Sequence, residues 1–242
     1  KMRSQGIEFE QVPDVIAFSQ ASIEADLTLS IHSSNGFGGF LPEVLEVLEH
    51  GVLWTQDGYS SHELADWTGD GRVDLWLSDG GTQLFPGGST PSFAPPIFTP
   101  IPGGFQLKYA KPSPVDLNLD GDLDAVLSIT VGTHVHLLTM LGNGTGAFTP
   151  LQSLPLESLP AYHYSAAGDF DLDGWVDAVT SHTRYFRGTA GGLLVGMGEL
   201  YGDVDLKALD TADLNGDGAT DVLAQTGEIL HGGPDGLSAP RG

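Results

Sequence analysis

The nine-residue stretch DLNLDGDLD, from Asp116 to Asp124, decides the fold of this chain because its pattern occurs four times. The other copies are DWTGDGRVD (residues 66–74), DFDLDGWVD (169–177) and DLNGDGATD (213–221), and we number the copies loops I to IV in chain order. Each copy has oxygen-bearing side chains at positions 1, 3, 5 and 9 and a glycine at position 6. Calcium is a hard cation that takes about six to eight oxygen ligands, which a short loop supplies by curling around one centre. The pattern therefore predicts four Ca²⁺ sites.

The expected ligands are the side chains at positions 1, 3, 5 and 9 and the backbone carbonyl at position 7. Glycine at position 6 permits the sharp turn that a Cβ would obstruct. The predicted metal-binding residues are Asp66, Thr68, Asp70, Arg72 and Asp74 in loop I, Asp116, Asn118, Asp120, Asp122 and Asp124 in loop II, Asp169, Asp171, Asp173, Trp175 and Asp177 in loop III, and Asp213, Asn215, Asp217, Ala219 and Asp221 in loop IV.

The EF-hand shares positions 1, 3, 5 and 6 of this pattern, but it requires a bidentate Glu at position 12 and flanking helices. Position 12 is occupied by Leu77, Leu127, Thr180 and Ala224, none of which has a carboxylate. The runs after the loops are short and rich in apolar and β-branched residues, as in strands. The EF-hand interpretation is therefore rejected.

Gly-rich turns form a second repeated feature, about 20 residues after each loop. They end at Phe40, Phe93, Phe148, Leu193 and Leu237, so there are five turns and only four loops. The additional unit contains Asp26-Leu27-Thr28-Leu29, but Phe18, Gln20, Ser22 and Ile23 stand where its metal ligands and glycine would be. Units of about 48 residues match the size of a four-stranded propeller blade.

The sequence thus predicts an all-β protein, a β-propeller of four-stranded blades. We favour five blades in a single domain, residues 1–242, with approximate limits 13–60, 61–107, 108–160, 161–204 and 205–242. Residues 6–12 have an alternating pattern and no blade of their own. We expect this N-terminal strand to complete the last blade, which would remove exposed sheet edges.

The loops and the Gly-rich turns together resemble the FG-GAP/VCBS repeat family, the calcium-loop propellers typified by the integrin α-subunit head. The resemblance extends from about Phe18 to Leu237. It implies a calcium-stabilised recognition or adhesion module that binds a protein or glycan ligand on the face opposite the calcium loops. Familiar members have seven blades, so five blades are a departure. The chain is then either a complete five-bladed ring, which we favour, or part of a larger ring.

Composition limits the partners that the chain can bind. The formal net charge is −23, from 32 acidic and 9 basic residues. Nucleic acids and anionic membranes are poor partners because their recognition relies on clustered Lys and Arg. No apolar run is long enough to span a membrane, so we expect no membrane insertion. Calcium sites of extracellular modules bind in the range of about 10⁻⁴ to 10⁻³ M, which favours an extracellular, cell-surface or periplasmic location.

The ligand-face candidates are aromatic residues and one histidine in the connections expected opposite the loops. They are Trp54, Tyr59, Phe105, Tyr109, Tyr162, His163, Tyr164 and Tyr201. Side chains with a large ring and a polar tip are common in recognition surfaces, although the same residues also pack between blades. A lectin with sugar sites between blades is the alternative function.

A polysaccharide lyase is the second alternative, with Lys108, Lys111, Arg184 and Arg187 as the basic residues that a uronate would need. The chain has no GxSxG, HExxH or phosphate-binding loop, so we expect no enzymatic activity. His134 and His136 share one face of a strand, but two histidines without a third ligand are weak evidence for a transition-metal site.

Overall fold

The computed structural model describes residues 15–19, 27–32, 44–48, 61–78, 81–88, 93–101, 111–131, 134–156, 164–200, 206 and 209–238, with backbone only for the first three ranges. All regular elements in these ranges are β-strands, and no helix occurs there. No helix in the described part of the chain is long and apolar enough to cross a membrane. The chain divides into two compact units, residues 1–58 with 88–92 and residues 59–87 with 93–242. The single-domain assignment stays a prediction.

The first unit contains one antiparallel sheet of three strands, β1 (Val15–Ser19), β2 (Leu27–His32) and β3 (Val44–Leu48), in the order β1-β2-β3. Strand β2 begins at Leu27, within the segment Asp26–Leu29 that the sequence assigned to the additional repeat unit.

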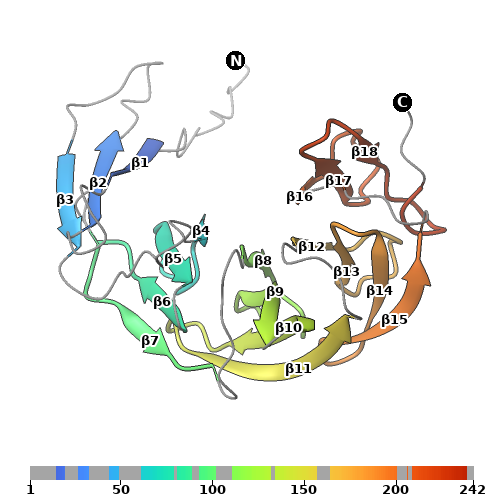
Figure 1. Cartoon of the computed structure of the whole chain (residues 1–242), viewed down its shortest axis with the longest axis horizontal. Coiled ribbons are helices and arrows are strands. Elements are labelled where there is room, and N and C mark those ends of the chain that lie inside the picture. Colours follow the sequence, from blue (N-terminus) through green and yellow to red (C-terminus); the bar gives the residue numbers. More distant parts are fainter. Residues whose placement is uncertain are drawn as a thin grey trace, which may run out of the picture. The chain divides into compact units, whose positions relative to one another are not determined.

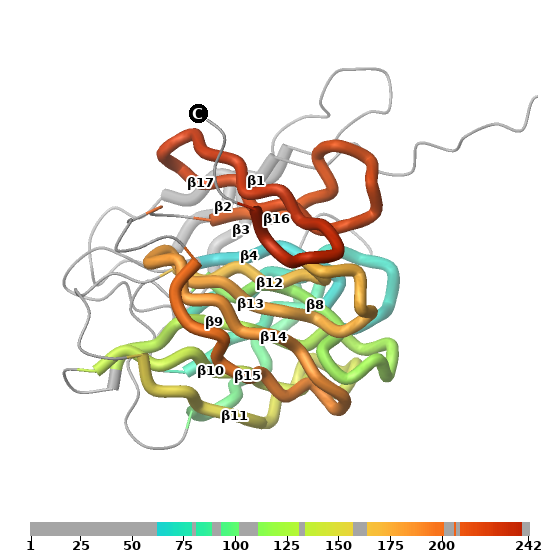
Figure 2. Tube along the Cα trace, turned by 90° about the vertical axis from the view of Figure 1, so that its right-hand side faces the viewer, coloured from blue at the N-terminus to red at the C-terminus, as the bar shows by residue number. Residues whose placement is uncertain are grey.

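The second unit contains four successive antiparallel meanders, which we call blades I to IV (Figure 1). Blade I consists of β4 (Ser61–Ala65), β5 (Asp74–Ser78), β6 (Thr82–Phe85) and β7 (Ile97–Thr99). Blade II consists of β8 (Ser113–Val115), β9 (Asp124–Val131), β10 (His134–Gly142) and β11 (Phe148–Leu156). Blades III and IV are β12 (Ser165–Gly168), β13 (Asp177–Thr180), β14 (Arg184–Thr189) and β15 (Leu193–Glu199), then β16 (Leu209–Ala212), β17 (Asp221–Ala224) and β18 (Ile229–Leu230). The meanders can be followed along the chain in Figure 2.

The blades of the second unit pack face to face through apolar side chains. Between blades I and II, Trp67 lies 4.9 Å from Trp76, and Trp76 lies 4.6 Å from Phe148, measured between ring centroids. All three rings are buried. Two further buried clusters join blade II to blade III and blade III to blade IV. Burial of one such large side chain contributes about 1.5–3 kcal/mol, so these clusters hold the blades together.

Strand β12 of blade III contacts β8 of blade II and β16 of blade IV, so the first strands of these blades lie next to one another. Adjacent meanders that meet along their first strands form a β-propeller. The all-β class and the propeller architecture are therefore confirmed.

Blade IV has three described strands, whereas blades I to III have four. Beyond β18, Ser238 N–H donates to the carbonyl of His231 at 2.8 Å, as at the start of a fourth strand. The proposed closing strand, residues 6–12, lies outside the described residues. The five-blade count and the N-terminal closure therefore stay predictions.

The structure corrects one position in the repeat alignment. The predicted Gly-rich turn of blade III ended at Leu193, but Leu193 is exposed and Leu194 is buried. Leu194 pairs with Gly188, as Phe148 pairs with Gly142 and Phe93 with Gly87. The turn is one residue longer than the sequence suggested because two leucines are adjacent there.

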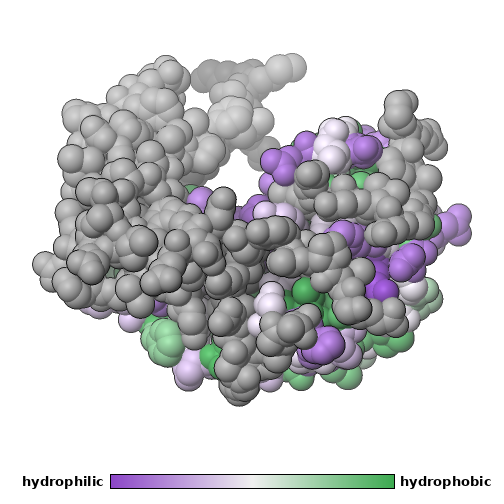
Figure 3. All heavy atoms as spheres, viewed as in Figure 1, coloured by the Kyte–Doolittle hydropathy of each residue, from purple (hydrophilic) through white to green (hydrophobic). Residues whose placement is uncertain are grey.

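Exposed apolar side chains are scattered over the described surface, and the face in Figure 3 shows hydrophilic and hydrophobic residues interspersed. The outer strand β15 carries three of them, Leu193, Val195 and Met197. They occupy alternate positions and therefore share one side of the strand.

Candidate functional site

Each of the four loops joins the first strand of a blade to its second strand. Loop I lies between β4 and β5, loop II between β8 and β9, loop III between β12 and β13, and loop IV between β16 and β17. The aspartate at position 9 is in every case the first residue of the second strand. The loops therefore occupy the same place in all four blades.

The position 9 aspartates are fully buried, with 0% exposure for Asp74, Asp124, Asp177 and Asp221. One oxygen of each carboxylate accepts a hydrogen bond from a backbone N–H near the start of its own loop, and the distances are 2.8–3.3 Å. The other oxygen accepts a backbone N–H from a glycine at the end of the third strand or just beyond it, at 2.7–2.9 Å. Each carboxylate thus ties its loop to the third strand of its blade.

The glycines that donate these bonds are Gly87, Gly142, Gly188 and Gly232. A Cβ on any of them would overlap the carbonyl oxygen of the residue at position 8 of the loop. Only glycine allows the two backbone segments to approach this closely. Sequence reasoning noted the Gly-rich turns but did not identify this role, although one glycine at the start of each turn was a usable signal.

The side chains at positions 1 and 5 accept backbone hydrogen bonds in every loop, and the side chain at position 3 does so in loops II to IV. In loop II, Asp116 accepts from the N–H groups of Asp120 and Gly121, at 3.1 and 2.9 Å. Asn118 accepts from Asp120 N–H at 3.0 Å, and Asp120 accepts from Asp122 N–H at 3.0 Å. The position 1 to position 6 bond and the position 5 to position 7 bond recur in all four loops. These bonds hold the backbone of each loop in a tight curl.

Position 4 has a left-handed backbone in every loop. Loops I and IV have glycine there, Gly69 and Gly216, with φ of 65° and 79°. Loops II and III have Leu119 and Leu172 instead, with φ of 62° and 63°, and both side chains are exposed. Leucine in this conformation is strained because its Cβ approaches the following carbonyl oxygen.

The oxygens of loop III fit a divalent cation. Asp169, Asp171 and Asp177, at positions 1, 3 and 9, each offer an oxygen within 4.8 Å of the others. Asp169 Oδ1 is buried and accepts no hydrogen bond, so one inward-facing oxygen has no protein partner. Asp173, at position 5, is outside this group and lies instead beside Arg187.

Burial raises the pKa of three of the position 9 carboxyls, because desolvation disfavours the ionised form. The pKa of Asp177 rises to about 6, and the pKa values of Asp74 and Asp124 rise in the same direction. The exposed Asp120 moves the opposite way, because the Asp122 N–H and the Asn118 amide hold its pKa below the usual value. A bound cation would favour the ionised form of the buried groups.

Most of the predicted ligand face cannot be compared with the structure. Trp54, Tyr59, Phe105, Tyr109, Tyr162, His163 and Tyr201 lie outside the described residues. Tyr164 is half-buried and packs against the apolar cluster between blades III and IV. Its backbone bonds to Ser181, so packing is part of its role.

The described basic residues proposed for a lyase are all in ion pairs. Lys111 lies 3.3 Å from Glu63, Arg184 lies 3.5 Å from Glu199, and Arg187 bonds to loop III. Lys108 lies outside the described residues. The predicted histidine pair lies on β10, where His136 Nδ1 is 3.0 Å from Ser153 Oγ. No group of three metal-ligating residues within the described ranges includes either histidine.

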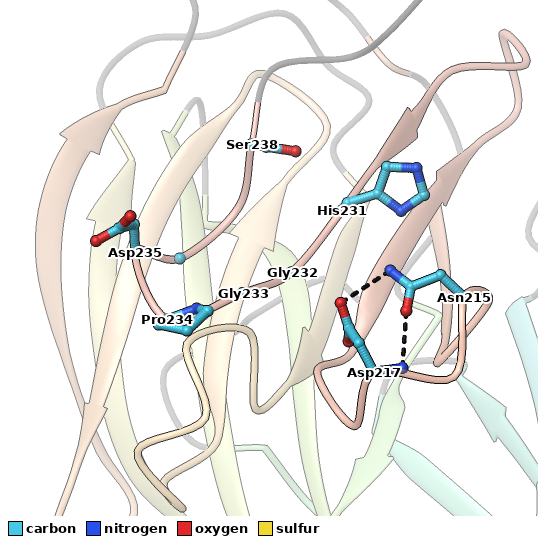
Figure 4. A pocket seen from close by; sticks show the side chains of 9 residues that line it. Asn215, Asp217, His231, Gly232, Gly233, Pro234, Asp235 and Ser238 are labelled. Carbon is cyan, nitrogen blue, oxygen red and sulfur yellow. Dashed lines mark hydrogen bonds between the residues drawn. The ribbon is translucent and has the colours of Figure 1, made fainter.

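A pocket of about 480 Å³ lies beside loop IV, and Figure 4 shows it between this loop and the turn after β18. Asn215 and Asp217 form one wall and are hydrogen-bonded to each other at 3.0 Å. His231 lies on another wall, with Nδ1 3.3 Å from Asp221 Oδ1. The sequence did not single out His231, Asp235 or Ser238, which also line the pocket.

Comparisons with known proteins agree with this architecture. Residues 116–180, which span loops II and III, match the model of the FG-GAP-like repeat. No curated protein sequence matches the chain. Among solved structures, the chain is similar to a lectin from Agrocybe aegerita, described as recognising non-reducing terminal N-acetylglucosamine, with 18% identity and a TM-score of 0.63. The alignment covers 95% of this chain and 65% of the lectin chain, so the chain spans about two thirds of that protein's length.

The lectin comparison shows the fold alone. The repeat match adds the loop pattern, which the structure places at one equivalent position in each of blades I to IV. The repeat match over residues 116–180 and the propeller arrangement of the blades together support a β-propeller of the FG-GAP type.

Proposed function

We propose that this chain is a calcium-stabilised recognition module in which loops I to IV each hold one Ca²⁺. The observation that carries the proposal is that Asp169, Asp171 and Asp177 each offer an oxygen within 4.8 Å of the others, while the buried Asp169 Oδ1 has no hydrogen-bond partner. In the other loops, the residues at positions 1 and 9 accept the equivalent backbone hydrogen bonds. The ligands would be the side chains at positions 1, 3, 5 and 9 and the carbonyls of Arg72, Asp122, Trp175 and Ala219.

Calcium would act here on stability. Each loop places three or four carboxylates within nine residues, and like charges at this spacing repel one another. If a site has a Kd near 10⁻⁴ M and calcium is near 10⁻³ M, linkage gives about 1.4 kcal/mol per site. Four sites then contribute roughly 6 kcal/mol, a large part of the usual stability of about 5–15 kcal/mol.

Thermal unfolding with calcium and with chelator tests this role. We expect calcium to raise the unfolding midpoint in a concentration-dependent way and magnesium to be much less effective, since Mg²⁺ prefers smaller octahedral sites. Equal midpoints in calcium and in chelator would refute it.

The ligand is proposed to be a glycan or a protein bound on the face opposite the loops, with the glycan favoured. The similar solved structure is a lectin, which supports a glycan, although the likeness itself concerns only the fold. The net charge of −23 favours neutral over anionic glycans. The alternative within this class is a set of sugar sites between blades.

A glycan array that includes terminal N-acetylglucosamine, run in calcium buffer, tests the glycan proposal. Binding that is lost on chelation would support both the ligand class and the calcium role. No binding to any glycan would shift the proposal to protein adhesion.

Location and ring size are part of the same proposal. We place the protein outside the cytoplasm, where calcium is abundant enough to fill sites with a Kd near 10⁻⁴ M. We also propose that strands β1 to β3 belong to a fifth blade and that residues 6–12 close the ring. A crystal structure would test the assignment of β1 to β3 to a fifth blade and the closure of the ring by residues 6–12.

A further inference from the structure

Loop III differs from the other loops in its charge. It has carboxylates at all four ligand positions, whereas loops I, II and IV each have three. The additional acid is Asp171 at position 3, where loops II and IV have asparagine and loop I has threonine. Without a cation, loop III should therefore be the most strongly self-repelling of the four.

The outer oxygen of the position 5 carboxylate accepts a side-chain hydrogen bond in every loop, but the donor differs. In loops II and IV, the donor is the asparagine amide at position 3, at 2.9 and 3.0 Å. Loops I and III have threonine and aspartate at position 3, and neither side chain has an amide. In these two loops an arginine side chain is the donor instead. Arg72 bonds to Asp70 in loop I at 2.7 Å, and Arg187 bonds to Asp173 in loop III.

Arg187 comes from strand β14 and not from the loop that it contacts. Its Nη2 lies 2.8 Å from Asp171 Oδ2 and 3.0 Å from Asp173 Oδ2, and Nε bonds to the same Asp173 oxygen at 3.2 Å. The Asp171 side chain is only 7% exposed, so this ion pair is partly shielded from water. The remaining oxygens of both carboxylates accept backbone N–H groups within the loop.

We propose that Arg187 is a tethered cation of loop III, which holds Asp171 and Asp173 together in the absence of calcium and lowers the affinity of this loop for the ion. The proposal rests on the calcium binding proposed above. Arg187 offsets the charge of the fourth carboxylate, and an incoming Ca²⁺ must displace the guanidinium or share its oxygens. Loss of Arg187 therefore has two opposite effects, a less stable metal-free protein and a tighter calcium site.

The test compares Arg187→Gln with Arg184→Gln, a matched control on the same strand whose arginine pairs with Glu199 at 3.5 Å. Terbium serves as the calcium analogue because nearby tryptophan sensitises its emission, and Trp175 lies at position 7 of loop III. The part of the terbium emission that is lost in Trp175→Phe therefore measures terbium bound to loop III. Thermal unfolding in chelator reports the metal-free stability.

We expect the Trp175-dependent emission of Arg187→Gln to appear at a terbium concentration roughly three- to tenfold lower than in the parent, the range set by one or two partly exposed ion pairs. Calcium should displace this terbium at a correspondingly lower concentration. The unfolding midpoint of Arg187→Gln in chelator should fall below those of the parent and of Arg184→Gln. Arg187→Lys, which keeps the charge but loses the planar fork, should lie between Arg187→Gln and the parent.

Unchanged affinity or unchanged metal-free stability in Arg187→Gln, with calcium still bound elsewhere, overturns the proposal. If Arg187→Gln does not fold without metal, the same two measurements are made on Arg187→Lys. The proposal is then overturned if Arg187→Lys has the same metal-free stability and the same terbium affinity as the parent. Absence of calcium and terbium binding in the parent protein would instead refute the calcium sites themselves.

Discussion

Replacement of Asp124 by alanine separates the structural role of a position 9 aspartate from its proposed role as a metal ligand. The Asp124 carboxylate is 0% exposed and accepts the N–H groups of Leu117 and Gly142, both at 2.8 Å. Alanine would leave both donors unpaired, at a cost of about 1–3 kcal/mol each. Burial raises the pKa of Asp124, so part of this loss is offset because the variant no longer buries a carboxylate. We therefore expect a loss of about 2–4 kcal/mol in the free energy of unfolding.

The loss should be present with and without calcium. Asp120→Ala is the matched control, because Asp120 is exposed and is the proposed position 5 ligand of the same loop. Its replacement should change the metal-free protein little and weaken mainly the stabilisation by calcium. Urea unfolding followed by tryptophan fluorescence suits the comparison, since Trp67 and Trp76 are packed in the apolar cluster between blades I and II. Equal stability of the two variants in chelator would refute the bridging role of Asp124.

Three further predictions concern single positions. Burial raises the pKa of Asp177 from 3.8 to about 6, so the folded state binds a proton more tightly than the unfolded state does. This group should therefore add about 2 kcal/mol to the stability of the metal-free protein between pH 7 and pH 4. Urea midpoints in chelator across this range check the sign, and Asp177→Asn should reduce the gain. Gly188→Ala should lower the free energy of unfolding by about 1–3 kcal/mol, because the new Cβ overlaps the Val176 carbonyl oxygen. An unchanged thermal midpoint would contradict this close approach of the two backbone segments. Leu119→Asn should raise the free energy of unfolding by about 1 kcal/mol, since asparagine tolerates the φ of 62° better than leucine. A denaturant titration checks this value, and a loss of stability would show that the exposed leucine has a packing role.

The repeat pattern predicted the fold class well because it contains both the loop and the strand that follows. The spacing of aspartates and glycine in Asp116–Asp124 requires a curled loop, and the apolar run after it requires a buried strand. The four copies correspond to the four sheets of the second unit, whereas the fifth blade that the Gly-rich turns suggested stays a prediction. The end of the turn in blade III was wrong by one residue, because Leu193 and Leu194 are equally apolar and only pairing with Gly188 distinguishes them.

The candidate site was predictable only in part. Composition and spacing selected the oxygens but treated all position 9 aspartates as simple ligands. Their complete burial, and the bond to a glycine 11–18 residues later in the chain, depend on the pairing of the second and third strands. Arg187 was considered only as a lyase residue, because it is 14 residues from Asp173 and its proximity depends on the register of β14.

By itself, the sequence determined the chemistry available to each loop, the length of the repeat and the all-β class. These properties depend on residues close together in the chain, where spacing fixes which groups share a turn or a strand face. The tertiary structure alone decided which carboxylates are buried, which glycines must remain glycine and which loop carries a tethered arginine. Those properties arise where strands distant in sequence pack together, and desolvation and close backbone approach exist only after that packing.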